Sequence, residues 1–136
     1  MSTYKNLALY QMAFNLAIKV YRLNITLPVT ALLNQGNKLR WTSLKMKDLI
    51  AEGFSGNKET GEIIRQLNIL IQLNNEVILL LKKIRSHNSA NKQIPELINS
   101  YKQLGQKAEE HLQSLQSEKT EYRISFPESM LMDLAG

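Results

Sequence analysis

The sequence predicts an all-α protein, a four-helix bundle that buries additional surface in an oligomer. The stretch Lys58–Arg85 contains no proline and has apolar residues at steps of three and four. As a helix, these about 28 residues would be roughly 42 Å long. A second apolar row, with Ile69, Leu73 and Leu80, is offset from the first. A helix that is apolar around this much of its circumference has to be covered on more than one side.

A first helix is expected over about Asn6–Leu23, where two apolar rows lie side by side. One row carries the aromatic residues: Leu7, Tyr10, Phe14, Ala17 or Ile18, and Tyr21. The other contains Leu9, Ala13, Leu16, Val20 and Leu23. The aromatic residues have the spacing of core positions, which favours packing over nucleobase stacking. Pro28 blocks continuation of the helix, and the short connection predicts that the second helix returns antiparallel to the first.

The second helix is expected from Thr30, as its N-cap, to about Phe54. Its core face combines large and small residues: Leu32, Leu39, Met46, Leu49 and Ile50 with Gly36, Thr42, Ser43 and Gly53. Small residues on this face allow a close approach of neighbouring helices. Leu33, Trp41 and Leu44 lie on the opposite face, where the core of one chain does not need them.

Four basic residues border this apolar patch, Lys38 and Lys45 on one side and Arg40 and Lys47 on the other. The patch is either a subunit interface with a polar rim or a stacking platform with phosphate contacts. One exposed aromatic residue favours the interface. We therefore expect an oligomer interface made by Trp41, Leu44, Leu33 and Leu73. The expected nucleic-acid contacts are Lys38, Arg40, Lys45 and Lys47, with Lys19 and Arg22 as further contributors.

The second half of the chain contains two expected helices and a tail. Asn57 is expected to cap the long helix, and Asn74, within its main apolar row, to determine helix register. Pro95 lies in the first turn of the fourth helix, whose core row is Leu97, Tyr101, Leu104, Ala108, Leu112 and Leu115. We divide the chain into a bundle over residues 1–120 and a tail over 121–136, which is either flexible or a docking segment for a partner.

The net charge of +5 on 136 residues is concentrated in the first half of the chain. Residues 1–54 contain seven basic and two acidic residues, a distribution typical of a polyanion-binding protein. A modest charge excess that only aids solubility is the alternative. The chain has no cysteine, no signal-peptide pattern and no apolar run long enough to span a membrane. The sequence thus predicts a soluble cytoplasmic protein without a membrane partner.

Residue patterns for catalysis are missing from the sequence. His87 and His111 have no second ligand at metal spacing, and the Glu-x-x-His pattern of di-metal bundles is absent. We find no phosphate-binding glycine loop, nucleophile elbow or catalytic triad. We therefore expect a non-enzymatic protein without a metal or cofactor.

Residues about 4–118 resemble the four-helix-bundle family encoded in intervening sequences of bacterial large-subunit rRNA genes. That family includes accessory variability determinants of diversity-generating retroelements. The matching positions are Tyr4–Leu7 and Gln11, Leu27-Pro28, Leu39-Arg40, Ile50–Gly53, Glu62, Leu73, Glu76 and Leu104–Lys107. The chain departs from the family at Arg40-Trp41, where paired arginines are common, and at Ser43–Asp48, where a proline is common.

The resemblance implies an antiparallel up-down bundle that assembles into a cyclic pentamer and binds nucleic acid through a basic surface. In the retroelement branch it also implies a reverse transcriptase as a partner, with its template RNA. An RNA-binding accessory protein for such an enzyme is the leading interpretation. The alternative is a structural or interaction protein, encoded in an rRNA intervening sequence, that has no essential nucleic-acid binding.

Overall fold

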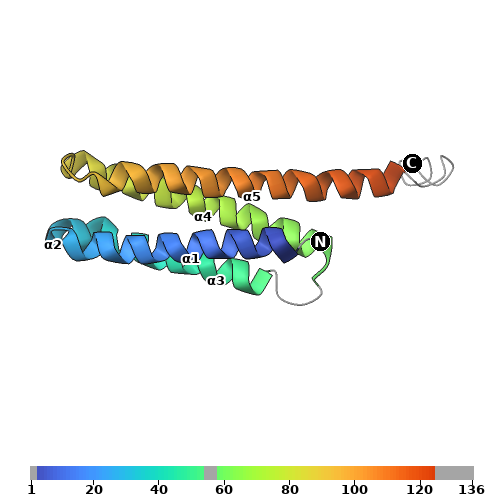
Figure 1. Ribbon diagram of the computed structural model, residues 1–136, viewed down its shortest axis with the longest axis horizontal. Coiled ribbons are helices and arrows are strands. Elements are labelled where there is room, and N and C mark those ends of the chain that lie inside the picture. The colour runs from blue at the N-terminus through green and yellow to red at the C-terminus, as the bar shows by residue number, and fades with distance from the viewer. Residues whose placement is uncertain (1–2, 54–57, 125–136) are drawn as a thin grey trace.

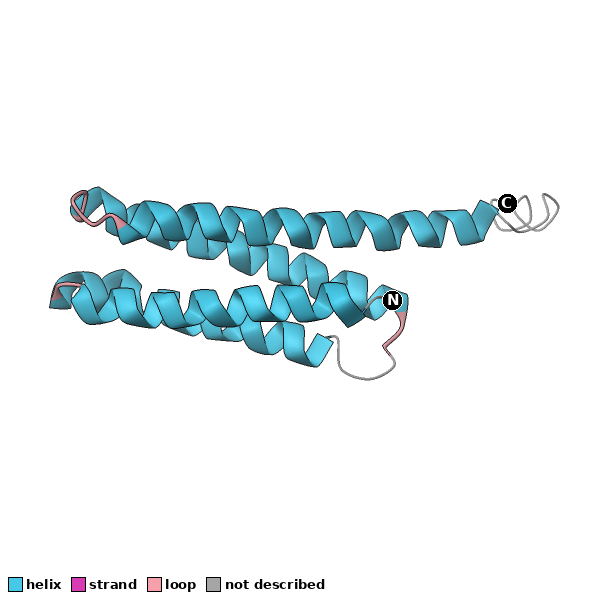
Figure 2. Cartoon of the chain, in the orientation of Figure 1, coloured by secondary structure: helices cyan, strands magenta, loops and turns pink. Residues whose placement is uncertain are grey.

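The computed structural model describes residues 3–53 and 58–124, and these form helices joined by short connections (Figures 1 and 2). The elements are α1 (Thr3–Thr26), α2 (Val29–Ala31), the π-helical segment η1 (Leu32–Gly36), α3 (Asn37–Gly53), α4 (Thr60–His87) and α5 (Gln93–Ile124). No strand occurs within the described residues. The predicted all-α, four-helix architecture is therefore confirmed.

The four long helices surround one apolar core. Helix α1 packs against α3 and α5, and α4 also packs against α3 and α5. In Figure 1, α1 and α3 lie below α4 and α5, and the C-terminal part of α5 extends past the other helices. Each long helix therefore covers two neighbours and leaves one side free for other contacts.

Helix α1 buries only one of its two apolar rows. The buried row contains Leu9, Ala13, Leu16, Ala17, Val20 and Leu23. The expectation that the aromatic row packs in the core is wrong for Phe14 and Tyr21, which are exposed, as is Ile18 between them. Two small residues, Ala13 and Ala17, let the buried row approach its neighbours closely. This row supplies most of the core contacts of α1, and Tyr10 and Met12 pack against the core from its edge.

The expected second helix is helical from Val29 to Gly53, but its first turns are irregular. Pro28, and not Thr30, occupies the N-cap of α2, with an extended ψ of 152°. Segment η1 then widens the helix where the buried Asn24 Nδ2 donates a hydrogen bond to Gly36 O, 2.8 Å away. A Cβ at Gly36 would lie 3.2 Å from Asn24 Oδ1 and 3.0 Å from Leu32 Cδ1. A larger residue at position 36 would crowd these two side chains, so the glycine provides room where α1 and η1 meet.

Small residues line the core face of α3, as the sequence predicts. Thr42, Ser43 and Gly53 are buried beside Leu39, Met46 and Ile50. The Thr42 and Ser43 hydroxyls donate to the carbonyl oxygens of Lys38 and Arg40 in their own helix. These internal hydrogen bonds let two polar side chains lie in a close-packed face without unpaired donors.

Helix α4 uses both of its apolar rows inside the bundle, because it lies between α3 and α5. Leu73, which we expected at an oligomer interface, is only 9% exposed and belongs to the core. Leu80 of the same row is also buried, while Leu79 is exposed. The long helix thus contributes little surplus apolar surface. The expected cap Asn57 and the expected helix end Phe54 lie outside the described residues.

Asn74 joins α4 to α5 at a buried position. Its Nδ2 donates a hydrogen bond to Tyr101 O across 2.8 Å. A Cβ at Gly105 would lie 2.6 Å from that same nitrogen. Gly105, a weak helix former, therefore provides the space for this contact. The geometry is the one expected of an asparagine that determines register.

Helix α5 begins at Gln93, with Pro95 in its first turn, and continues to Ile124. It thus runs past Glu121, the expected start of the tail. Residues 125–136, the rest of that tail, lie outside the described residues. The division of the chain at residue 120 and the flexible tail stay predictions.

Candidate nucleic-acid interface

The outward face of α3 presents two large apolar side chains, and Trp41 is 63% exposed and Leu44 39% exposed. They are exposed because Leu39, Met46 and Ile50 direct the opposite face of the helix into the core. A shallow groove, called the α3 groove below, is lined by Trp41, Leu44, Lys45, Asp48, Leu49 and Glu52. The sequence identified this face correctly.

The four basic residues of α3, called the α3 cations below, are Lys38, Arg40, Lys45 and Lys47. Lys38 Nζ lies 3.1 Å from a carboxylate oxygen of Glu76 on α4, and Lys47 Nζ lies 3.1 Å from Asp48. The Lys38–Glu76 pair is well exposed, so water screens it and it contributes little stability. Both lysines nevertheless have an acidic neighbour that competes with phosphate.

Arg40 and Lys45 differ from the other two α3 cations, because neither has a carboxylate within ion-pair distance among the described residues. Lys45 Nζ lies 5.0 Å from the centre of the Trp41 ring, a cation–π contact. Such a contact at an exposed site is worth about 0.5–1 kcal/mol, less than a charge-assisted phosphate contact. Arg40 and Lys45 are therefore the α3 cations best placed to bind a polyanion.

Lys19 and Arg22 lie apart from this group, on the α5 side of α1. They line a surface depression with Gln93, Glu96, Leu97 and Ser100. The nearby Glu96 reduces the positive potential there. The structure therefore does not join the two residues to the α3 cations in one continuous basic surface.

Leu33 lies in η1 and is exposed, as expected for an interface residue. Sequence reasoning missed a longer apolar surface on α1, the stripe of Phe14, Ile18, Tyr21 and Ile25, called the α1 stripe below. The sequence contained one indication of which row of α1 is buried. The neighbouring row contains the small residue Ala13, and small residues also indicate the core face of the second helix.

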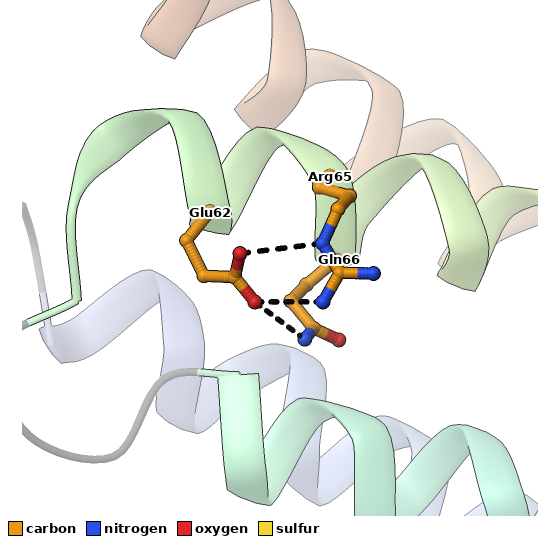
Figure 3. A network of polar contacts seen from close by, with 3 residues as sticks. All are labelled: Glu62, Arg65 and Gln66. Atoms are coloured by element: carbon orange, nitrogen blue, oxygen red, sulfur yellow. Dashed lines mark hydrogen bonds and ion pairs between the residues drawn. The ribbon is translucent and has the colours of Figure 1, made fainter.

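A polar network connects the first turns of α4 (Figure 3). One oxygen of Glu62 accepts from the Arg65 guanidinium over 2.7 Å and from Gln66 Nε2 over 3.2 Å. The hydrogen bond from Arg65, and then that from Gln66, lowers the pKa of Glu62 from 4.5 to about 2. A Cβ at Gly53, the last residue of α3, would lie 3.2 Å from Gln66 Cβ. The network thus holds Gln66 where the end of α3 packs against α4.

Tyr101 is a buried titratable group with a shifted pKa. Burial raises the pKa of its phenol, and the neighbouring Ser43 side chain opposes that shift only in part. Because the phenol lies inside the bundle, between α3 and α5, its role is in packing.

The described residues contain no cluster of three His, Cys, Asp or Glu side chains that could bind a metal ion. None of the described helices has an apolar stretch that would reach across a lipid bilayer. Comparison of the chain with protein-family models, curated proteins and solved structures produced no match. The case for a function therefore rests on the surface of α3 and on the resemblance in sequence.

Proposed function

We propose that the protein is a non-enzymatic RNA-binding accessory protein of the kind that supports the reverse transcriptase of a diversity-generating retroelement. The four α3 cations would contact RNA phosphates. The bundle would follow the antiparallel up-down course and assemble into a cyclic oligomer, for which the resemblance implies a pentamer. The reverse transcriptase would be a second, protein partner.

The observation that carries the proposal is the placement of Arg40 and Lys45 on the exposed face of α3. Both are solvent-exposed, and neither is neutralised by a carboxylate among the described residues. Lys38 and Lys47 can join them by exchanging an exposed acidic neighbour for a phosphate. Contacts of this kind bind the nucleic-acid backbone and give little sequence preference.

One α3 surface carries only four cations, so a single subunit would bind RNA weakly. Assembly would raise the affinity. A cyclic oligomer repeats that surface once per subunit, and linked weak contacts add as avidity. The exposed Trp41, Leu44 and Leu33 supply apolar surface for such an assembly. Basic residues at the rim would then face the nucleic acid on every subunit.

The test is a salt titration of binding to an RNA oligonucleotide. Replacing all four α3 cations by Gln removes up to four phosphate contacts per subunit, each worth about 0.7–0.9 in the slope of log affinity against log salt. We expect a flatter slope, weaker binding and an almost unchanged melting temperature. The matched control changes four exposed lysines elsewhere, Lys82, Lys83, Lys102 and Lys107, to Gln.

Equal slopes for the wild type and the α3 variant, or the same loss in the control variant, would contradict the proposed site. The second candidate is an interaction protein encoded in an rRNA intervening sequence, and the exposed α1 stripe favours it. The gene neighbourhood separates the two. A reverse transcriptase with template and variable repeats favours the first, and a location inside an rRNA gene favours the second.

A further inference from the structure

The α1 stripe is a continuous apolar surface that the fold of one chain leaves uncovered. Its members are exposed by 43% at Phe14, 37% at Ile18, 54% at Tyr21 and 68% at Ile25. Steps of four, three and four residues place them on one face over about 16 Å of helix. The ring of Tyr10 stacks on Phe14 with a centroid separation of 6.2 Å and extends the stripe. Contiguous apolar surface of this kind marks an interaction site.

We propose that the α1 stripe of one subunit packs into the α3 groove of a second copy of this chain. The inference rests on the assembly in the proposed function and names the two surfaces that meet. The contact is heterologous, because stripe and groove are different parts of the molecule. Repetition of such a contact closes a ring when the rotation between subunits permits.

Charge favours this pairing over contact between two α1 stripes. Arg22 lies one helical turn from both Ile18 and Ile25, so it borders the stripe. Asp48 lies one turn from Leu44 and lines the α3 groove. The groove is lined by two acids, Asp48 and Glu52, and one cation, Lys45, so stripe against groove brings Arg22 to a surface with one net negative charge. Stripe against stripe would bring two copies of the same arginine together.

The exposed apolar area of the stripe and the groove is also large enough for an interface with a second copy of the chain. Six side chains contribute the apolar surface, namely the four of the stripe with Trp41 and Leu44. At about 200 Å² for a whole large side chain, their exposed fractions amount to roughly 600 Å². Apolar atoms make up about 57% of a typical interface, so the complete contact would bury about 1,000 Å². That area is the lower bound for a specific interface.

The test uses two variants, each of which introduces charged residues into one of the two surfaces. The stripe variant carries Ile18→Glu and Tyr21→Glu, and the groove variant carries Trp41→Glu and Leu44→Glu. We expect light scattering to return an oligomer for the wild type and a monomer of 15.6 kDa for each variant. An equimolar mixture should form a heterodimer, because one intact groove and one intact stripe are present. Leu79→Glu, an exposed change on α4, should leave the wild-type mass unaltered.

The affinity of that heterodimer provides a second test, in which only the charges at Arg22 and Asp48 are changed. Arg22→Asp in the groove variant should weaken the heterodimer about two- to five-fold, the range of an exposed ion pair. Asp48→Arg in the stripe variant should then restore the affinity. Circular dichroism verifies that every variant keeps the helicity of the wild type.

Each other outcome overturns a specific statement. A wild-type monomer would overturn both the assembly in the proposed function and this contact. An oligomeric wild type with an equally oligomeric stripe variant would overturn the contact alone. Two monomeric variants that do not pair would show that stripe and groove do not meet. A stripe variant that keeps its mass but loses RNA binding would make the stripe a nucleic-acid surface instead.

Discussion

Replacing Gly105 by Ala should destabilise the bundle, although alanine is the better helix former. The substitution gains roughly 0.8–1.0 kcal/mol in helix propensity. The new Cβ, however, would lie 2.6 Å from Asn74 Nδ2, which is hydrogen-bonded to Tyr101 O. Displacing the buried amide from its partner costs about 1–3 kcal/mol. The expected net change is a loss of about 1 kcal/mol in the free energy of unfolding.

The sign should reverse when Asn74 is absent. In an Asn74→Ala background the space beside residue 105 is free, so Gly105→Ala should stabilise by about 1 kcal/mol. The double-mutant cycle should therefore return a coupling of about 2 kcal/mol. Urea unfolding followed by circular dichroism measures all four proteins. All measurements use a single protein concentration, because the proposed assembly would make the apparent stability depend on concentration.

Gly61→Ala is the matched control, because nothing lies within 4 Å of a Cβ at Gly61 on α4. It should stabilise by up to about 1 kcal/mol in both backgrounds. The explanation of Gly105 as a space requirement fails if Gly105→Ala stabilises the wild type as much as Gly61→Ala does.

Two more predictions concern charged groups. Arg40→Gln with Lys45→Gln should lower the salt slope of RNA binding by about 1.4–1.8 per subunit. Lys38→Gln with Lys47→Gln should lower it less in the same titration, since those two already have acidic neighbours. Because the pKa of Glu62 is depressed to about 2, its contribution to stability is complete above pH 4.5 and is lost as the pH falls toward 2. The difference in free energy of unfolding between the wild type and Glu62→Gln should therefore narrow over that interval, and a constant difference would contradict the pKa shift.

Local patterns were sufficient to predict the helices. Steps of three and four residues, interrupted at Pro28 and in the polar segment after His87, predicted four helical regions near their observed positions. The small residues of α3 and the asparagine of α4 also identified close contacts correctly. Each of these signals depends on residues that are near each other in the chain.

The sequence did not predict which apolar rows are buried or which charges pair between helices, because these depend on the neighbouring helices in the fold. Both rows of α1 are apolar, and only the positions of α3 and α5 select the row of Leu16 and Val20 for burial. Leu73 was expected at an oligomer interface because its row is offset from the main apolar row of α4. It is buried instead, because α4 packs against both α3 and α5. The ion pair between Lys38 and Glu76 joins residues 38 positions apart, so no local pattern indicates it.

The proposed assembly and the proposed RNA binding can be tested separately, because the α1 stripe contains none of the α3 cations; on α3 the two surfaces share Lys45, which also lines the groove. Ile18→Ser with Tyr21→Ser spoils the α1 stripe, leaves the net charge at +5 and keeps all four α3 cations. If avidity over repeated subunits supplies most of the affinity, this variant should bind RNA about 10²- to 10⁴-fold more weakly. Each monomer would still make the phosphate contacts of Arg40 and Lys45, so its binding should still weaken with salt. Fluorescence anisotropy on a labelled RNA at two salt concentrations measures both quantities, with the mass determined in parallel. A monomeric variant with wild-type affinity would mean that one α3 surface is sufficient, and the argument from repetition would then be wrong.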